Sequence, residues 1–111
     1  MYTDKHTPPY FAVIFTSIQT ENRNGYSEMA MQMEDLAKKQ PGFLGIDAAR
    51  DGLGITVSYW ESMAAISQWK QQADHLFAQK RGQEQWYKQY AVRICEVKRS
   101  YDFNSVAQHI K

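Results

Sequence analysis

The sequence predicts an α+β domain in which strands and helices follow one another in the order β-α-β-β-α-β. Three observations carry this prediction: an apolar run typical of a buried strand, two stretches with helical apolar spacing, and an Asp-Gly pair between two strand-like segments. The chain has 111 residues, which is the length of a single domain. A domain this short gains stability when it shares a core with a second copy.

Residues 10–18 are predicted to form the first strand. Their sequence, YFAVIFTSI, is rich in β-branched and aromatic residues, and apolar side chains occupy nearly every position. This is the pattern of a strand that is covered on both faces. The segment ahead of it is polar and contains consecutive prolines, so residues 1–8 are predicted to be a flexible tail.

The first helix is predicted to follow this strand. Apolar residues recur there at the i, i+3, i+4, i+7 spacing of an amphipathic helix. These residues are Tyr26, Met29, Ala30, Met33, Leu36 and Ala37. The competent N-caps ahead of them are Thr20, Asn22 and Asn24. Lys38 and Lys39 favour the C-terminal end of the helix dipole, and Pro41 and Gly42 predict that the helix ends there.

A β-hairpin is predicted between about Leu44 and Trp60. The segments FLGIDAAR and LGITVSYW both resemble strands. Asp51 and Gly52 separate them, and this pair is favoured in two-residue hairpin turns.

A second helix and a last strand complete the order. Ser62 is a candidate N-cap for the helix. The residues with helical spacing are Met63, Ile66, Trp69, Ala73, Leu76 and Phe77. A break in this helix is expected near Asp74 and His75, with helix resuming toward Trp86. The final strand is predicted over 90–101, with Val92 and Ile94 on one side and Ala91, Cys95, Val97 and Tyr101 on the other.

This order defines the ferredoxin-like split β-α-β arrangement, in which an antiparallel sheet carries both helices on one face. Both faces of the first strand are nevertheless apolar, because Phe11, Val13 and Phe15 alternate with Tyr10, Ala12 and Ile14. Helices can cover only one of these sets. The other set should meet the same face of a second copy, so we predict a symmetric homodimer whose two sheets close into a barrel.

Composition and charge exclude several classes of function. The formal net charge is +1, and basic residues form no stripe of the kind that nucleic acid binding requires. The sequence contains no apolar run long enough for a membrane helix and no apolar N-terminal signal, so we expect a cytoplasmic protein without a membrane partner. Cys95 is the single cysteine and cannot form an intramolecular disulfide. The domain itself is predicted over 9–103, with a C-terminal tail over 104–111.

Two motifs carry a family resemblance. They are Gln40-Pro41-Gly42-Phe43-Leu44-Gly45 after the first helix and Tyr59-Trp60-Glu61-Ser62 before the second, with Trp69 and His75 downstream. Together they resemble the antibiotic biosynthesis monooxygenase family of dimeric α+β barrels. That resemblance covers about residues 10–103. It implies a range of activities that includes cofactor-independent oxygenases of aromatic polyketides, quinol oxygenases and haem-degrading enzymes.

The function predicted first is a cofactor-independent monooxygenase-like activity on a small aromatic or quinone-type substrate. One alternative is a non-catalytic or stress-related dimer that holds a small apolar molecule. Another is haem binding or degradation, with His75 as an axial ligand. In the haem-degrading branch, the resemblance implies an asparagine on the first strand, and YFAVIFTSI contains none.

His75 is the candidate catalytic base. A histidine can remove a proton from a phenolic substrate and leave an electron-rich anion that reacts directly with oxygen. The competing interpretation is that His75 lies beside Asp74 at a solvated helix break. Trp60 is the candidate stacking wall for a flat aromatic ligand, against the alternative that it fills the core.

Further candidate substrate-binding residues are Trp69, Tyr87, Tyr90 and Arg93. Trp69 lies on the apolar stripe of the second helix, and core packing is its alternative role. Tyr87 and Tyr90 could line a pocket or a dimer rim. Arg93 could hold a substrate carboxylate or phenolate, or form an ordinary ion pair. The sequence contains no standard nucleotide, flavin or metal motif, so no cofactor is predicted, although haem or flavin binding without a linear motif stays open.

Overall fold

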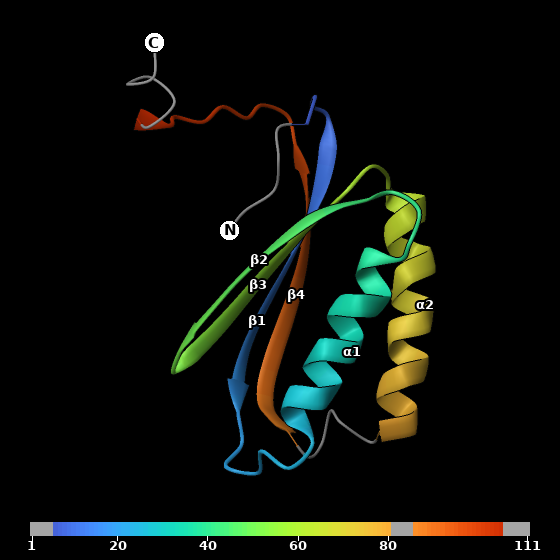
Figure 1. Cartoon of the computed structure of the whole chain (residues 1–111), viewed down its shortest axis with the longest axis vertical. Helices are drawn as coiled ribbons and strands as arrows, with labels where there is room; N and C mark the ends of the chain where they lie inside the picture. Colours follow the sequence, from blue (N-terminus) through green and yellow to red (C-terminus); the bar gives the residue numbers. More distant parts are fainter. Residues whose placement is uncertain (1–5, 81–85, 106–111) are drawn as a thin grey trace.

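The computed structural model describes residues 6–80 and 86–105, and these residues form one sheet and two helices in the predicted order (Figure 1). The elements are β1 (Tyr10–Gln19), α1 (Tyr26–Lys38), β2 (Phe43–Asp51), β3 (Leu53–Trp60), α2 (Met63–Lys80) and β4 (Tyr87–Val97). The antiparallel sheet has the strand order β2-β3-β1-β4. The predicted ferredoxin-like α+β fold is therefore confirmed.

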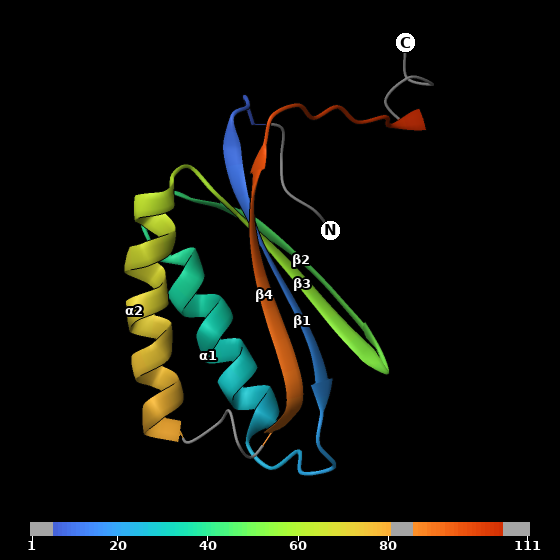
Figure 2. The ribbon, with the colours of Figure 1, turned by 180° about the vertical axis from the view of Figure 1, so that it is seen from behind.

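Both helices lie on the same side of the sheet (Figures 1 and 2). The register places Val13 opposite Ser58 on β3 and Ile94 on β4, and Val13 packs into the core beneath the helices. Because side chains alternate along a strand, Phe11, Val13 and Phe15 share this helix-facing side. Tyr10, Ala12 and Ile14 lie on the opposite side, which we call the open face.

The open face presents an apolar patch at one end of the sheet. Ile18 on β1 pairs with Leu53 on β3, and Thr16 pairs with Ile55. The exposed fractions are 39% for Ile18, 48% for Leu53 and 41% for Ile55. The helices cannot cover these side chains, because both helices lie on the opposite side of the sheet.

The centre of the core is built around Trp60 at the end of β3. Its exposed fraction is 0%, and its indole N–H donates a hydrogen bond of 2.8 Å to the Ser58 hydroxyl. The rings of Phe43 and Trp69 lie 5.4 and 5.3 Å from the Trp60 ring. The buried residues around it are Val13, Ala37, Ala65 and Ile66. Helix α2 and strand β3 are thus held together by contacts between aromatic rings.

The start of α1 differs from the prediction. Gly25 precedes the helix with φ +78°, and no side chain caps it. The carboxamide of Asn22, an expected cap, instead accepts a hydrogen bond from the backbone N–H of Asn24 at 3.1 Å. Trp86, which directly precedes β4, donates from its indole N–H to the Asn24 carbonyl at 2.8 Å and so fixes the turn before α1.

The expected break in α2 is wrong, because the helix runs without interruption from Met63 to Lys80. Asp74 and His75 both lie on its exposed surface and leave the apolar stripe intact. Lys70 forms an i, i+4 ion pair with Asp74 at 2.9 Å, which supports the helix at this point. The Ser62 hydroxyl accepts a hydrogen bond from the Ala65 N–H at 3.1 Å, which confirms Ser62 as the N-cap.

The last strand begins and ends earlier than predicted, at Tyr87 and Val97. Residues 98–104 follow it with no regular secondary structure. The predicted tails fall partly on residues 1–5 and 106–111, which lie outside the described residues. The proposed domain limits therefore stay predictions.

Candidate functional site

One row of residues crosses the helix-facing side of the whole sheet. Arg50 on β2 pairs with Gly54 on β3, Gly54 pairs with Ser17 on β1, and Ser17 pairs with Tyr90 on β4. The guanidinium of Arg50 donates a hydrogen bond of 2.6 Å to the Ser17 hydroxyl and one of 3.5 Å to the Ser17 carbonyl. Arg50 therefore lies flat across β3 and carries its charge to the middle of the sheet.

Gly54 makes this arrangement possible. A Cβ atom at position 54 would overlap the Arg50 guanidinium. The absence of a side chain lets the arginine cross close to the backbone of β3. Ser17, which receives the guanidinium, is itself buried.

Aromatic rings surround the β4 end of this row. Phe15 stacks on Tyr90 with ring centres 5.4 Å apart, and Phe15 also meets the edge of Tyr87 at 5.6 Å. Tyr26 from α1 and Phe77 from α2 contact Tyr87 at 6.0 and 6.4 Å. The two helices therefore close over Tyr87, whereas Tyr90 keeps an exposed surface.

Gln19 adds an unsatisfied acceptor to this region. It lies two residues beyond Ser17 on β1 and pairs with Tyr87 on β4. Its side chain is buried, and its Oε1 atom has no hydrogen-bond partner among the described residues. A buried acceptor without a partner is costly, and such a group is a feature of binding sites. We call Ser17, Gln19, Arg50, Tyr87 and Tyr90 the tyrosine–arginine cluster.

The electrostatics of the cluster keep Tyr87 protonated. Burial raises the pKa of Tyr87, and its hydrogen bond with Tyr26 raises it further, while the nearby positive charge of Arg50 lowers it. The net direction is upward, so at neutral pH the Tyr87 hydroxyl is a hydrogen-bond donor.

We expect Tyr87 to ionise at a higher pH than a tyrosine of an unfolded chain, whose pKa is 10.0. Above that pH the unfolded chain loses the proton while the native protein retains it. The native state then binds more protons than the unfolded chain does. The contribution of Tyr87 to the free energy of unfolding is therefore fully present below pH 10.0 and is lost as pH rises further. Absorbance titration of tyrosinate measures this directly. The absorbance change at the highest pH should be smaller in Tyr87→Phe and unchanged in the matched variant Tyr101→Phe. If Tyr87→Phe keeps the full absorbance change at the highest pH, Tyr87 is not the tyrosine with the raised pKa.

The predicted tryptophans lie in the core, apart from this cluster. Trp60 is fully buried, and Trp69 packs against it with its indole nitrogen buried and without a partner among the described residues. Both belong to the packed interior between α2 and β3. The structure does not expose the Trp60 ring to a ligand.

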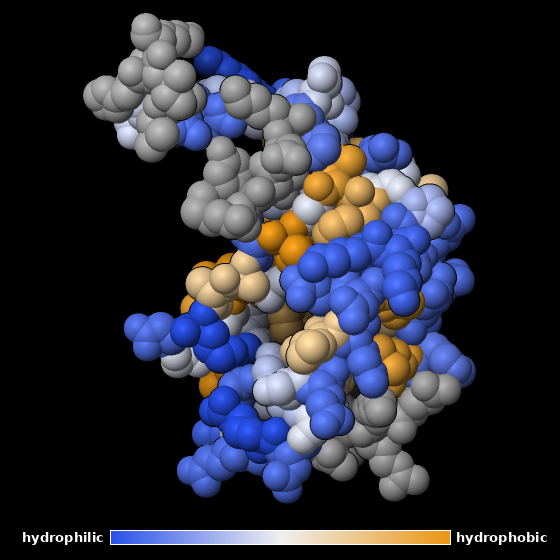
Figure 3. Space-filling view, in the orientation of Figure 1, coloured by the Kyte–Doolittle hydropathy of each residue, from blue (hydrophilic) through white to orange (hydrophobic). Residues whose placement is uncertain are grey.

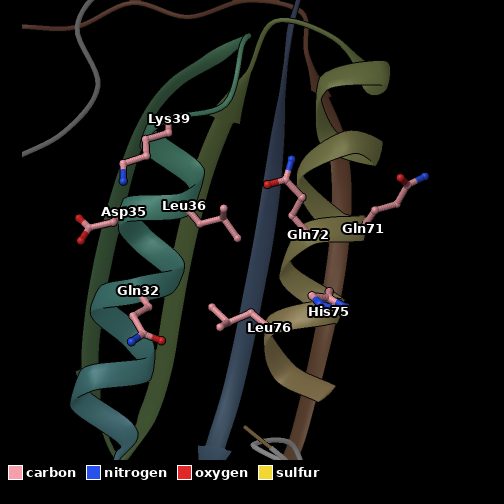
Figure 4. A pocket seen from close by; sticks show the side chains of 8 residues that line it. All are labelled: Gln32, Asp35, Leu36, Lys39, Gln71, Gln72, His75 and Leu76. Atoms are coloured by element: carbon pink, nitrogen blue, oxygen red, sulfur yellow. The ribbon is translucent and has the colours of Figure 1, made fainter. Parts of the chain in front are cut away.

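His75 lies elsewhere, on a groove between the two helices (Figure 4). Leu36 of α1 and Leu76 of α2 point toward each other across it, and His75 and Gln71 point outward from α2. The groove has a volume of about 580 Å³. In Figure 3 the helix layer is mainly hydrophilic, with small hydrophobic areas among the polar side chains. His75 and Trp60 therefore do not face one cavity.

Arg93 lies on the open face, opposite Ile14 of β1, and shares that face with Cys95. On the same face Tyr59 donates a hydrogen bond of 3.3 Å to Asp47. Burial, followed by the charge of Asp47, raises the pKa of Tyr59. Of the predicted site residues, the structure thus brings Tyr87 and Tyr90 together in the cluster, and Trp60 and Trp69 together in the core.

Arg50, Ser17 and Gln19 were not among the residues predicted from the sequence. The signal that could have found them is a strand-interior glycine, Gly54, facing an arginine in a predicted hairpin. The two-residue turn expected at Asp51 and Gly52 is wrong by one residue, because it would pair Arg50 with Leu53, whereas the structure pairs Asp51 with Leu53 and Arg50 with Gly54. The predicted turn therefore did not give the pairing of Arg50 with Gly54.

Metal-ligand clusters and membrane-spanning helices are both absent from the described part of the chain. No group of three or more His, Cys, Asp and Glu side chains there could hold a metal ion. No helix of residues 6–80 or 86–105 is long and apolar enough to cross a membrane.

The fold and the cluster define a ferredoxin-like α+β protein with an aromatic, arginine-containing surface on the helix-facing side of its sheet. Comparison with known proteins assigns its family. The model of the antibiotic biosynthesis monooxygenase family matches residues 9–81, and the chain belongs to that family.

Its relatives support this assignment. The protein YqjZ of Bacillus subtilis strain 168 is 52% identical over 94 residues, which cover 83% of this chain and 82% of YqjZ. SnoaB of Streptomyces nogalater, a cofactor-independent oxygenase, has a TM-score of 0.69 at 8% identity, with 84% of this chain and 97% of SnoaB covered. PA3566 of Pseudomonas aeruginosa has a TM-score of 0.63 at 19% identity, with 87% of this chain and all 100% of that chain covered. The two solved structures show a shared fold.

Proposed function

We propose that this protein is a cofactor-independent, monooxygenase-like enzyme that binds a small aromatic or quinone-type substrate at the tyrosine–arginine cluster. The observation that carries the proposal is the row across the sheet, which places the Arg50 charge next to the stacked rings of Phe15 and Tyr90. Family membership and the fold shared with SnoaB support an oxygenase-like role.

The chemistry of the cluster suits an ionised phenol. A flat ring can stack against Tyr90, and the guanidinium of Arg50 can hold a phenolate oxygen. The unsatisfied Gln19 oxygen can accept a hydrogen bond from a second hydroxyl group of the substrate. Holding the substrate as an anion makes it electron-rich and reactive toward oxygen.

The proposed reaction balances without another reductant. A phenol that loses two hydrogen atoms and gains one oxygen atom becomes a quinone. The second oxygen atom of O₂ takes up those two hydrogen atoms and leaves as water. The substrate supplies all four electrons that reduce O₂.

The test is oxygen uptake by purified, chelator-treated protein with a panel of phenols and quinols. We expect one O₂ consumed per quinone formed, with binding of a quinone product perturbing tyrosine fluorescence. Product formation that stays at the rate of the buffer blank across the panel would count against the proposal.

A second candidate function is binding of a small apolar molecule without turnover. The groove between α1 and α2 favours it, because Leu36 and Leu76 face each other there beside His75. A bound ligand should raise the Tm, as linkage requires. If His75→Ala removes this stabilisation and Arg50→Ala does not, the groove is the binding site.

We also propose a homodimer formed through the open face. The exposed patch of Ile18, Leu53 and Ile55 supports this, since a sheet face with such side chains is stabilised by packing on another sheet. A symmetric pair would use the same face on both copies. Light scattering across a concentration series tests the assembly.

A further inference from the structure

The segment after β4 carries the two most exposed large apolar side chains of the described residues. Tyr101 is 88% exposed and Phe103 is 70% exposed. We call residues 98–104 the C-terminal arm. The arm leaves the sheet on the side opposite the helices, in both views of the ribbon (Figures 1 and 2). It therefore projects into the space in front of the open face.

The open face has its own uncovered apolar patch, made by Ile18, Leu53 and Ile55. This patch lies at the far end of the sheet from the arm. Val97, where β4 ends, pairs with Tyr10, while Leu53 pairs with Ile18. From Tyr10 to Ile18 the strand extends about 27 Å, and from Tyr10 to Thr16, the partner of Ile55, about 20 Å.

The arm cannot cover the whole of this patch in its own chain. Tyr101 lies four residues beyond Val97, which allows at most about 14 Å of extended backbone even after a complete reversal of direction. Phe103 lies six residues beyond Val97 and extends at most about 21 Å, which reaches the row of Ile55 and stays short of Ile18 and Leu53. A contact of the arm with Ile18 and Leu53 therefore requires a second chain.

We propose that the C-terminal arm is an intersubunit clamp, in which Tyr101 and Phe103 pack on the Ile18–Leu53–Ile55 patch of a second copy of this chain. The inference rests on the proposed homodimer. When two copies face each other with their strands in opposite directions, the arm end of each sheet lies over the patch end of the other. The two-fold symmetry repeats the contact, so each arm covers one patch.

The chemistry of the arm suits this partner. Aromatic residues carry much of the binding free energy at protein interfaces, and they pack well on β-branched and leucine side chains. The Arg99 guanidinium lies 5.7 Å from the centre of the Tyr101 ring. Arg99 can therefore form part of the polar rim around the aromatic contact.

The first experiment measures the dimer dissociation constant of the full chain by sedimentation equilibrium. The double variant Tyr101→Ser/Phe103→Ser should raise it by about tenfold or more. The matched control is Met31→Ser, which removes an apolar side chain that is 64% exposed on α1 and should leave the constant unchanged. Circular dichroism checks that each variant keeps its fold.

The second experiment traps the contact by disulfide formation in a Cys95→Ser background. Chains carrying only Tyr101→Cys are mixed with chains carrying only Leu53→Cys, and a crosslinked heterodimer is expected. Mixing Tyr101→Cys with Met31→Cys should give far less product. The clamp alone is overturned if the wild-type protein is dimeric, the Tyr101→Ser/Phe103→Ser variant dimerises equally tightly, and the mixture of Tyr101→Cys and Leu53→Cys chains does not crosslink. A wild-type protein that stays monomeric at all concentrations overturns both the dimer and the clamp.

Discussion

Replacing Arg50 with alanine is expected to lower kcat/KM for the phenolic substrate by about 100-fold, the effect of removing one preorganised donor from a developing oxyanion. Arg50 supplies the positive charge of the tyrosine–arginine cluster and is oriented by its 2.6 Å hydrogen bond to Ser17. Arg50→Lys keeps a charge but loses the planar fork, so it should recover only part of the activity. The measurement is steady-state oxygen uptake.

Gly54→Ala tests the same geometry without removing the charge. The added methyl group would occupy the space of the Arg50 guanidinium, so Arg50 must move away from Ser17. Activity should fall in the same direction as in Arg50→Ala. Lys70→Ala, on the exposed surface of α2, is the matched control for loss of a positive charge and should leave kcat/KM unchanged. Full activity in Arg50→Ala together with loss of activity in His75→Ala would move the site to the groove between the helices.

Trp60→Ala is expected to lower the free energy of unfolding by about 3–5 kcal/mol, the range for deleting a large buried aromatic side chain. Trp60 has an exposed fraction of 0% and contacts Phe43 and Trp69. Its removal leaves a cavity between α2 and β3 and takes the hydrogen-bond donor away from the buried Ser58 hydroxyl. Urea denaturation measures the loss.

Trp60→Phe separates the two contributions to this loss. It retains much of the ring volume and removes the indole N–H, so its effect should be smaller than that of Trp60→Ala. Met31→Ala, at an exposed position on α1, should change stability by no more than about 0.5 kcal/mol. A Trp60→Ala protein as stable as wild type would show that this side chain is not central to the core.

Several elements were predictable because local patterns determine them. The hairpin was recognisable from Asp51 and Gly52, and Gly52 adopts a positive φ of +77°. Its register differs by one residue from that of the expected two-residue turn, because Asp51 itself pairs with Leu53. The end of α1 followed from Pro41 and Gly42, and the start of α2 followed from Ser62, whose hydroxyl caps the helix as expected. The start of α1 was not predictable, because the contact of Trp86 with Asn24 spans 62 positions and competes with local capping.

The candidate site was predictable only in part. Tyr87 and Tyr90 were found because aromatic residues cluster just ahead of the predicted last strand. His75 and Trp60 were both predicted as site residues, yet one lies on the outer surface of the helices and the other in the core. Alternation and helical spacing separate the faces of one element, but they do not show which residues of different elements meet.

The sequence by itself determined the order of the elements, the hairpin and the apolar character of both sheet faces, because each depends on residues close together in the chain. The tertiary structure decided which side chains form the cluster. Arg50 and Ser17 are 33 positions apart and meet at 2.6 Å only because β2, β3 and β1 pair in one particular register. A shift by one residue would place Arg50 on the open face, so the charge of the proposed site depends on strand pairing rather than on any local motif.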